Sequence, residues 1–375
     1  MFKFFKTKKN HFLGVDFGTS AIKVVELAYK NSQITLSNYG WVDFGSDENS
    51  GKMNYENKKE KLIKYLEMLL KEMKVKSDSV YTAIPAHNGL SVIVNFPDIS
   101  DEEIAKAIKL EAGKHIPSPL DEVYLSWDVV LRDKKKGGIF DKAKDRMSHK
   151  EGEKKKESIE VMLVAAPKEE VLNYEDIIKG CGLKVKSLEL DIFSIVRSVI
   201  GEDLGTYLIV DIGSRATNII LVDKGIVRIN RSLSVGGNEI TNTIKSSMSV
   251  TWDRAERFKK KPRDFFSSKE AVSILPILSS ISSEAKRIIN EYSKKNPEKK
   301  NPVDSVIISG GTSLLTNLDS YFAKELGVKV VSSNPWKRVK VKDPLLEERL
   351  SEMAPSFSVA IGLALKGVDD YCRDI

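Results

Sequence analysis

Short apolar segments with period-two spacing alternate along the chain with longer segments whose apolar residues recur every three or four positions. Residues 11 to 45 hold three runs rich in β-branched and aromatic residues, "HFLGVDFG", "AIKVVELAYK" and "SQITLSNYGWVDF", which predict a three-stranded meander. Residues 57 to 75 then place apolar side chains, from Leu62 to Leu69, along one side of a helix. We therefore expect a helix to cover this sheet.

A second pattern fills the middle of the chain. The stretch "VYTAIPAHNGLSVIVNFPDI" predicts two strands separated by Pro85 and Gly89, and the spacing of Ser100 and Glu103 predicts a capping box at the start of a helix. Two more strands are predicted in "DEVYLSWDVVL" and "SIEVMLVAAP". The charged residues 132–158 between them include too few apolar side chains to bury a core, so we expect a long, mobile hairpin loop.

The opening pattern returns after Gly205. A strand in "KSLEL" passes directly into a helix in "DIFSIVRSVI", and "TYLIVDIGSRATNIILVDKGIVRINRSLSVGG" then repeats the strand, the aspartate, the glycine and the small residues of the first meander. The match of "DFGTSAIK" to "DIGSRATN" indicates an internal duplication. It predicts two similar α/β halves that face one another.

Composition limits the class of protein. With 375 residues, 41% of them hydrophobic, the chain is long enough for two or more domains. Its formal charge of +7 comes from two segments, residues 1–9 with four lysines and no acid, and residues 132–158 with 11 Lys and Arg against 6 Asp and Glu. The rest of the chain is slightly acidic, so no basic face is indicated and nucleic acid is not an expected partner.

Several features indicate a cytoplasmic protein without a metal cluster of its own. The two cysteines, Cys181 and Cys372, suit a reducing compartment, and no apolar run approaches the roughly 20 residues of a membrane span. The four histidines are scattered without metal-ligand spacing. The initial "MFKFFKTKKNH" is open to two interpretations, a solvated terminus or weak contact with an anionic lipid surface.

Two tight hairpins carry the candidate chemistry. Magnesium polyphosphate needs carboxylates near the metal's water shell, and backbone N–H groups and small hydroxyls near the phosphate oxygens. We expect Asp16 and Asp211 to reach the magnesium through water and Lys23 to neutralise phosphate charge. The predicted phosphate-contacting residues are Gly18, Thr19, Ser20, Gly213 and Ser214. A single turn of this kind is more often an ordinary turn, but two copies favour a phosphate site.

Gly310 and Gly311, in "SVIISGGTSLLTNLDSYFAKEL", form a third glycine-rich element. They stand between an apolar strand and a helix that we expect to begin near Ser313, where a nucleoside can lie against bare backbone. The alternative interpretation is a plain strand-to-helix turn.

The order of phosphate hairpin, connecting helix, phosphate hairpin and Gly-Gly turn resembles the actin, sugar kinase and heat-shock chaperone ATPase superfamily. Within it, the resemblance is to the type IV pilus assembly protein PilM family, relatives of the cell-division protein FtsA. It rests on six stretches, "LGVDFGTSAIKVVEL", "EAGKHIPSPLDEVYLSWDV", "VMLVAAPKEEV", "VDIGSRATNI", "SNPWKRVKV" and "APSFSVAIGLALKG". The implied fold is α/β, an actin-like (ribonuclease H-like duplicated) two-lobe ATPase fold with an FtsA/PilM-type inserted subdomain, and the implied cofactors are ATP and Mg.

The resemblance also implies a domain organisation. The first lobe core, subdomain 1A, comprises residues 1–80 and is completed by about 181–203 and 355–375. Residues 81–180 form the inserted subdomain 1C, with the mobile loop 132–158. The second lobe consists of subdomain 2A, residues 204–242 and 301–354, and subdomain 2B, residues 243–300.

Further site roles follow from the resemblance. Asp191, at the start of the connecting helix, stands where related ATPases keep a polar residue that orients the attacking water, although a simple N-cap is an equal alternative. Glu256 and Lys259 match the ribose- and adenine-contacting pair of the relatives, or else form a solvated i,i+3 pair. Gly237 and Thr312 complete the implied nucleotide-binding residues.

Arg215 departs from the family pattern, which usually has a small residue there. Its side chain either fills part of the second phosphate loop or reaches a phosphate itself. We therefore expect ATP binding, and leave open whether the chain hydrolyses ATP slowly.

The resemblance implies a cytoplasmic, ATP-binding scaffold of the pilus assembly machinery. Its expected partners are the N-terminal tail of a PilN-like membrane protein, bound in a groove beside the "VYTAIPAHNGLSVIVNFPDI" strands, and other pilus assembly components. Contact with the inner membrane would come mainly through the partner, and a homo-oligomer is an open alternative. The competing functions are an FtsA-like membrane-recruited filament protein and a small-molecule kinase on the same fold.

Overall fold

Three β-sheets and the helices that cover them make up the described part of the chain, which comprises residues 10–44, 55–132, 158–261, 266, 271–299 and 301–374 of the computed structural model. The chain divides into two compact units, one of residues 88–169 and one of residues 1–87 and 170–375. Two five-stranded sheets belong to the larger unit, and a three-stranded sheet belongs to the smaller.

The first sheet of the larger unit has the order β3-β2-β1-β4-β8. Its strands are β1 (His11–Phe17), β2 (Ala21–Lys30), β3 (Gln33–Asp43), β4 (Ser79–Ile84) and β8 (Lys184–Leu190). β1, β2 and β3 pair antiparallel, which confirms the predicted meander, and β4 pairs parallel to β1. Helices α1 (Tyr55–Met73) and α4 (Lys168–Gly180) cover one face, with Leu66 and Ile178 packed in one core with Leu13 and Val15.

The second sheet of the larger unit repeats this plan in the order β11-β10-β9-β12-β13. Its strands are β9 (Thr206–Ile212), β10 (Thr217–Asp223), β11 (Ile226–Leu233), β12 (Ser305–Ser309) and β13 (Val330–Ser332). β9, β10 and β11 form a second antiparallel meander, and β12 pairs parallel to β9 as β4 does to β1. The duplication predicted from the sequence is therefore a duplication of sheet topology.

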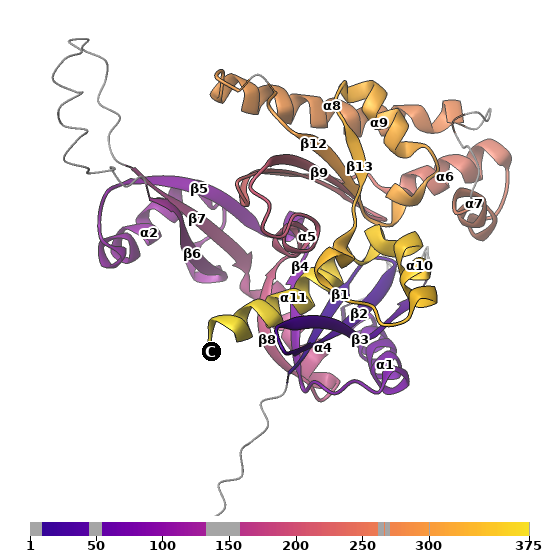
Figure 1. Cartoon of the computed structure of the whole chain (residues 1–375), viewed down its shortest axis with the longest axis horizontal. Coiled ribbons are helices and arrows are strands. Elements are labelled where there is room, and N and C mark those ends of the chain that lie inside the picture. The colour runs from indigo at the N-terminus through magenta and orange to yellow at the C-terminus, as the bar shows by residue number, and fades with distance from the viewer. Residues whose placement is uncertain are drawn as a thin grey trace, which may run out of the picture. The chain divides into compact units, whose positions relative to one another are not determined.

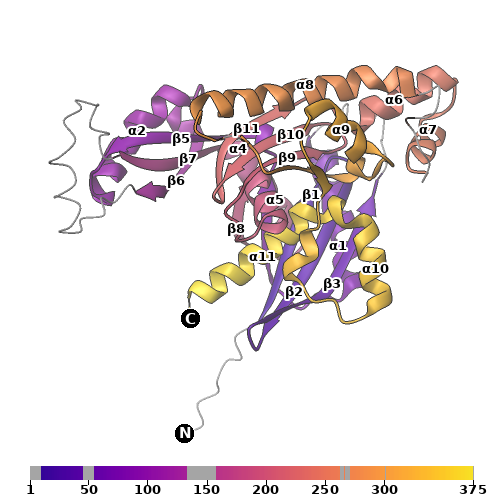
Figure 2. The same ribbon diagram turned by 45° about the horizontal axis from the view of Figure 1, so that its top comes forward.

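Helices α8 (Ala271–Lys295) and α9 (Leu318–Leu326) contact the strands of this second sheet. Helix α6 (Gly237–Met248) packs on α8, and α7 (Trp252–Lys259) packs on α6. Figures 1 and 2 show α8 lying across the strands, and its buried Ile281 and Ala285 share one core with Leu208 and Val210 of β9. Apolar burial of this kind is the main stabilising contribution to such a layer.

Helices α5 (Asp191–Val199) and α11 (Ser358–Arg373) lie between the two sheets and pack against each other (Figure 1). α5 follows β8 directly, as the sequence predicts, and contacts β4 and β10. α11 is preceded by α10 (Pro344–Met353) and a 3₁₀ turn (Ala354–Phe357), and it packs on β1, β2 and β4. The last helix of the described chain therefore completes the first sheet's core.

Two glycines allow α11 to approach its neighbours closely. A Cβ atom on Gly14 of β1 would overlap the carbonyl oxygen of Ala360, and a Cβ atom on Gly362 would overlap the carbonyl oxygen of Ser194 in α5. Both obstacles are backbone atoms, which cannot rotate away as a flexible side chain can. The small residues of "SFSVAIGLALKG" are therefore explained by close backbone packing.

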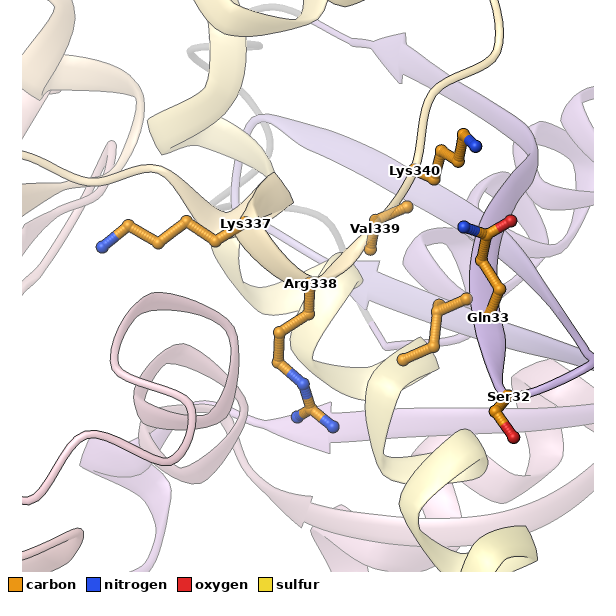
Figure 3. Close-up of a pocket in the computed structure, with 7 residues that line it drawn as sticks. Ser32, Gln33, Lys337, Arg338, Val339 and Lys340 are labelled. Atoms are coloured by element: carbon orange, nitrogen blue, oxygen red, sulfur yellow. The ribbon is translucent and has the colours of Figure 1, made fainter.

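A short extended segment lies along β3 at the edge of the first sheet. The N–H of Lys340 donates to Ile34 O (2.9 Å), and the N–H of Leu36 donates to Lys340 O (3.1 Å). The segment follows the 3₁₀ turn Pro335–Arg338 and, with the β2–β3 turn, encloses a shallow groove of about 410 Å³. Figure 3 shows Lys337 and Lys340 pointing apart on either side of Arg338, whose Nη2 lies 2.6 Å from Asp369 Oδ1. The diverging lysines do not converge on a single anion.

The smaller unit has a three-stranded sheet of order β5-β7-β6. Its elements are β5 (Leu90–Pro97), α2 (Asp101–His115), β6 (Val123–Arg132), β7 (Ser158–Pro167) and the 3₁₀ turn Leu120–Glu122. The capping box of Ser100 and Glu103 begins α2 as predicted, and Ile104 and Ile108 bury that helix on the sheet. β5 and β6 are the two edges of the sheet.

The boundaries of this unit differ from the range 81–180 expected for the insertion. β4 pairs with β1 and β8, and α4 packs on the first sheet, so both ends of that range contribute to the larger unit's core. The two strands of "VYTAIPAHNGLSVIVNFPDI" consequently belong to different sheets. The predicted loop lies mostly outside the described residues, at 133–157, and joins β6 to β7 where Arg132 is paired with Ile159.

Replacing Gly362 by Ala tests the close packing of α11. The added Cβ atom has to displace the α5 backbone, so we expect a loss of at least about 2 kcal/mol in the free energy of unfolding, measured by denaturant titration. Gly113→Ala is the matched control, because Gly113 is also helical but has open space around its Cβ position. It should be neutral or stabilising by about 0.5–1 kcal/mol. Similar stabilities for the two variants would contradict the packing argument.

Candidate functional site

A cavity of about 880 Å³ lies within the larger unit, between its two sheets. Its size falls in the range that small-molecule and cofactor sites occupy. Its lining includes nearly all the site residues predicted from the sequence, namely Asp16, Gly18, Thr19, Ser20, Lys23, Asp191, Asp211, Gly213, Ser214, Glu256, Lys259, Gly310, Gly311 and Thr312. Gly237 lies behind the lining, where its N–H donates to Gly213 O (2.9 Å) and its carbonyl accepts from Lys259 Nζ (3.0 Å).

The two predicted hairpins have the same local geometry. A Cβ atom on Gly18 would lie 2.9 Å from Ala21 O, and one on Gly213 would lie 2.9 Å from Ala216 O, three residues further along in both cases. Only a glycine avoids this contact, so each hairpin exposes bare backbone at its tip. The tips meet, because the hydroxyls of Thr19 and Ser214 hydrogen-bond to each other. Groups on both tips therefore face the same part of the cavity.

Strand alternation places the two hairpin aspartates. On β1, Leu13, Val15 and Phe17 face the α1 and α4 core, so Gly14 and Asp16 face the other side, toward α11. On β9, Leu208, Val210 and Ile212 face α8, so Asp211 also points away from its helical layer. Both carboxylates consequently enter the cavity from the two sheets.

Three partly buried carboxyl groups, on Asp16, Asp191 and Asp211, have raised pKa values, chiefly because burial disfavours their charged forms. Burial and the nearby Asp211 raise the pKa of Asp191 to about 8. Burial raises the pKa of Asp211 to about 6, although a hydrogen bond from Ser309 and the charge of Lys23 oppose the shift. Burial also raises the pKa of Asp16, against the effect of Lys23, whose Nζ is 3.6 Å from Asp16 Oδ2. Ionising all three groups is unfavourable unless a cation compensates them.

Asp191 is fixed by contacts from separate segments. It is the first residue of α5, with Leu190 at the N-cap position. Its Oδ1 accepts the backbone N–H of Ala86 (3.0 Å), and its Oδ2 accepts from Asn218 Nδ2 (3.4 Å). Sequence reasoning did not identify Asn218 as part of the site. Its signal is its register, because Asn218 pairs with Asp211 as Lys23 pairs with Asp16.

The Gly-Gly turn differs in one respect from its prediction. Gly310 has φ +85°, and a Cβ atom there would lie 2.5 Å from Ile212 O, so the turn requires glycine. The residues after it form a 3₁₀ turn, Gly311–Leu314, and the helix predicted to begin near Ser313 begins at Leu318 instead. The reason is local, since Asn317 adopts a left-handed conformation that separates the 3₁₀ turn from α9.

Lys259 is buried and forms a cluster with the partly buried Glu256, which excludes the solvated-pair alternative. The side chain of Lys259 is 9% exposed, and its Nζ contacts Glu256 Oε2 (2.7 Å), Thr241 Oγ1 (2.8 Å) and the Gly237 carbonyl (3.0 Å). These acceptors use all three ammonium protons. Burial opposes ionisation of Glu256, but Lys259 lowers its pKa below the usual value. The cluster ties α7 to α6 at the wall of the cavity.

No sequence motif predicted that several other residues would line the cavity. Trp41, on β3, and Trp252, in the first turn of α7, both line the cavity. Lys260 Nζ lies 3.5 Å from Asp43 Oδ2, which connects α7 to the end of β3. These residues are brought together only by folding, because 209 or more positions separate the two groups in sequence.

A family model described as type IV pilus assembly protein PilM matches residues 14–142 and 145–368. The chain belongs to this PilM family. The match extends over both duplicated meanders and most of the smaller unit. It confirms the family resemblance seen in the sequence.

Solved structures confirm the actin-like two-lobe fold. A PilM-PilN type IV pilus biogenesis complex resembles this PilM-family chain with a TM-score of 0.76 and 26% identity, over 95% of this chain and 98% of that chain. MreB5 of Spiroplasma citri bound to AMPPNP has a TM-score of 0.50 and 14% identity, over 98% and 99% of the two chains. The ethanolamine utilization protein EutJ from Carboxydothermus hydrogenoformans has a TM-score of 0.51 and 16% identity, over 95% and 89%. At these identities the last two show the fold alone.

Curated relatives are more distant. Cell division protein FtsA of Neisseria meningitidis is 24% identical over 227 residues, which are 54% of this chain and 53% of that protein. FtsA of Pseudomonas aeruginosa is 32% identical over 90 residues, 23% of this chain and 21% of that protein. The chain thus spans about half the length of the first curated relative and about a fifth of the second. Among the described helices, none is long and apolar enough to cross a bilayer.

Lys259→Met tests the buried cluster. It leaves Glu256 and the Gly237 carbonyl without their cation, so we expect the free energy of unfolding to fall by about 2–4 kcal/mol. Lys260→Met is the adjacent control, because the side chain of Lys260 is 60% exposed. Its loss should stay below about 1 kcal/mol. Denaturant titration of both variants decides the point, and equal losses would show that the Lys259 cluster adds no particular stability.

Proposed function

We propose that this PilM-family chain binds ATP with magnesium in the cavity between its sheets and acts as a scaffold of the type IV pilus assembly machinery. The observation that carries the proposal is the pair of glycine hairpins with matching geometry, Gly18 and Gly213, whose tips meet beside three carboxyl groups. Family membership supports the pilus role. Nucleotides in relatives with the same fold support the ligand, since the MreB5 structure is bound to AMPPNP.

The phosphate end of the nucleotide would lie at the hairpin tips. Gly18 and Gly213 expose backbone there, while Thr19, Ser20 and Ser214 offer hydroxyl donors. Lys23 would give a cation to the phosphates. Gly310 and Gly311, beside the second hairpin, where Thr312 Oγ1 donates to Gly213 O (3.2 Å), would leave room for the nucleoside. Glu256 and Lys259 are also in the lining.

The carboxyl groups fit a magnesium ion that keeps its water shell. Asp16 and Asp211 offer the hard oxygen ligands that Mg²⁺ prefers, and burial raises the pKa of both carboxyl groups, a cost that a nearby cation would offset. Within the described residues, no three His, Cys, Asp or Glu side chains are grouped to hold a metal directly. Bound magnesium would neutralise phosphate charge. Water between the ion and both aspartates is the arrangement this donor set supports.

Asp191 is the residue we assign to orienting a water molecule. The Ala86 N–H and the Asn218 amide hold its two oxygens, so its carboxyl group is fixed before any ligand arrives. A buried carboxyl with a pKa of about 8 exchanges a proton near neutral pH, which suits slow hydrolysis. ATP binding does not depend on this role.

Asp16→Ala combined with Asp211→Ala should abolish magnesium-dependent ATP binding, because both candidate contacts to the metal's water shell are lost. Calorimetric titration with ATP, with and without magnesium, measures the effect. Asp253→Ala is the control, since Asp253 lines the same cavity from α7 rather than from a hairpin. Unchanged magnesium-dependent affinity in the double variant would defeat the proposed site.

The scaffold role rests on a peptide partner. A solved relative was determined as a PilM-PilN complex, and we extend that partner to this chain. In the smaller unit, β5 and β6 are edge strands, each with one row of backbone groups outside the sheet. An extended peptide can pair with such an edge while side-chain pockets supply the choice of sequence. We assign the N-terminal tail of a PilN-like membrane protein to the β5 edge, because β5 belongs to the stretch predicted to form the peptide groove.

Binding to this partner would also place the chain at the inner membrane. A cytoplasmic protein that binds the tail of an inner-membrane protein becomes peripheral at that membrane without a span of its own. The subdomain scheme 1A, 1C, 2A and 2B accompanies the proposal, with 1C centred on residues 88–169. Other pilus assembly components and further copies of the chain are additional partners in this scheme.

A synthetic tail of about a dozen residues from the neighbouring PilN-type protein should bind with micromolar-range affinity, because short extended ligands lose entropy on ordering. Fluorescence anisotropy of a labelled tail measures it, with a scrambled tail as the control. Equal binding of the two peptides would refute sequence-selective recognition. Absence of binding with or without ATP, together with phosphorylation of a sugar or another small molecule, would establish the kinase function instead.

A further inference from the structure

Two strands of the second sheet place a buried serine beside one of the candidate magnesium residues. β12 pairs parallel to β9, and in this register Ser309, the last residue of β12, lies opposite Asp211. Val306 and Ile308 belong to the core that α8 covers, so Ser309 points to the other face of the sheet, as Asp211 does. The Ser309 side chain is 0% exposed, so its hydroxyl meets protein groups only.

The duplicated first sheet has a different arrangement at the equivalent position. β4 pairs with β1 as β12 pairs with β9, and continuing that register places Ala83 opposite Asp16. The methyl group of Ala83 offers no hydrogen bond, and the carboxylate of Asp16 has Lys23 Nζ at 3.6 Å instead. In the second sheet the strand position of Lys23 is the neutral Asn218, whose amide donates to Asp191 (3.4 Å). The second hairpin's aspartate therefore has a serine hydroxyl where the first has a cation on its own hairpin.

The direction of the hydrogen bonds around Ser309 follows from the acceptors that are present. Ser309 Oγ lies 2.9 Å from Ser358 Oγ, and the two hydroxyls lie 3.4 and 3.1 Å from the carbonyl oxygen of Pro355. That carbonyl already accepts the N–H of Gly310 (3.0 Å). Each hydroxyl has one proton, and a carboxylate is the strongest acceptor nearby, so Ser358 donates to Ser309 and Ser309 donates to Asp211. This last hydrogen bond opposes the rise that burial causes in the pKa of Asp211.

The supporting serine is itself held by the helices between the sheets. Ser358 is the first residue of α11 and is buried, and its carbonyl oxygen accepts the hydroxyl of Ser198 of α5 (2.7 Å). The chain of hydroxyls thus begins at α11 and ends on the carboxylate of the second sheet. Its geometry is fixed by protein groups alone, before any ligand arrives.

We propose that Ser309 is a positioning residue for magnesium, whose hydroxyl, supported by Ser358, holds the Asp211 carboxylate in the orientation that meets the water shell of the ion. The inference rests on the proposed nucleotide site and adds to it a residue that acts through Asp211. Ser309 touches neither the ion nor the phosphates, because it is completely buried. Without its hydroxyl the carboxylate can turn between several orientations, and ordering it again opposes binding of the ion.

The test is a double-mutant cycle of Ser309→Ala and Asp211→Ala, in which calorimetry measures ATP affinity with magnesium and with a chelator in its place. Ser309→Ala should fold, because Ala83 takes the equivalent position in the first sheet. Ser309→Thr keeps the hydroxyl. Ser282→Ala is the matched control, since Ser282 is 1% exposed and its hydroxyl donates to a carbonyl of α8, the Ser279 oxygen (3.1 Å). Thermal melts check the folding of every variant.

We expect Ser309→Ala to weaken ATP binding with magnesium roughly tenfold, at the lower end of the effect of residues that orient metal ligands, because water lies between Asp211 and the ion. Affinity in the chelator should stay within about twofold of wild type, and Ser282→Ala should match wild type in both conditions. Ser309→Thr should restore most of the loss. In the Asp211→Ala background, where Asp16 still contacts the ion, Ser309→Ala should change the affinity by less than about twofold.

Several results would overturn the inference while leaving the nucleotide site intact. They are an unchanged affinity in Ser309→Ala, equal losses with and without magnesium, additive losses in the cycle, and a folded Ser309→Thr that restores nothing. If the wild type does not bind ATP with magnesium, the proposed function fails, and the inference with it.

Discussion

The close approach of α11 to β1 and α5 is the constraint on which the cavity depends. Gly14 and Gly362 allow backbone-to-backbone contact at two crossings, with Ala360 and with Ser194. α5 begins at Asp191, and the first residue of α11, Ser358, hydrogen-bonds to Ser309 of the second sheet (2.9 Å). The same contacts that fix these helices between the sheets therefore fix Asp191 between the two hairpin aspartates. A larger residue at either glycine would move the carboxyl groups apart.

The raised pKa values of these carboxyl groups make the stability of the fold depend on pH. A buried acid with a raised pKa favours its protonated form in the folded state, so its contribution to stability is greatest below its unfolded pKa and is lost as the pH rises through the folded pKa. For Asp191 and Asp211 this interval ends near pH 8 and pH 6. Sites that hold cations commonly trade stability for function in this way, since repulsion in the empty site becomes attraction for the ion. In the neighbouring Lys259 cluster the charge is hydrogen-bonded within the fold, so this cluster stabilises the packing of α7 on α6.

Internal duplication gave the chain two copies of one glycine hairpin, and their side chains have since diverged. The backbone geometry stayed alike, as the equal contacts of Gly18 and Gly213 show. The side chains did not, because Lys23 corresponds to Asn218 and Ser20 corresponds to Arg215. Backbone shape at the hairpins is set by glycine and strand pairing, so it persists while the exposed tips change. This separation lets a related fold serve as an enzyme, a filament or a scaffold.

The sequence by itself determined the local structure and the chemistry of the hairpins. Period-two runs predicted the strands, Ser100 and Glu103 predicted the start of α2, and the repeated Asp-x-Gly identified the duplication, because each signal comes from neighbouring residues. Tertiary structure decided which elements share a sheet and which side chains meet. It separated β4 from β5 and brought Asn218, Trp41 and Trp252 to the cavity. It also buried Lys259, which a helical spacing alone leaves at the surface. These outcomes depend on contacts between residues far apart in the chain, and no periodicity within one segment records them.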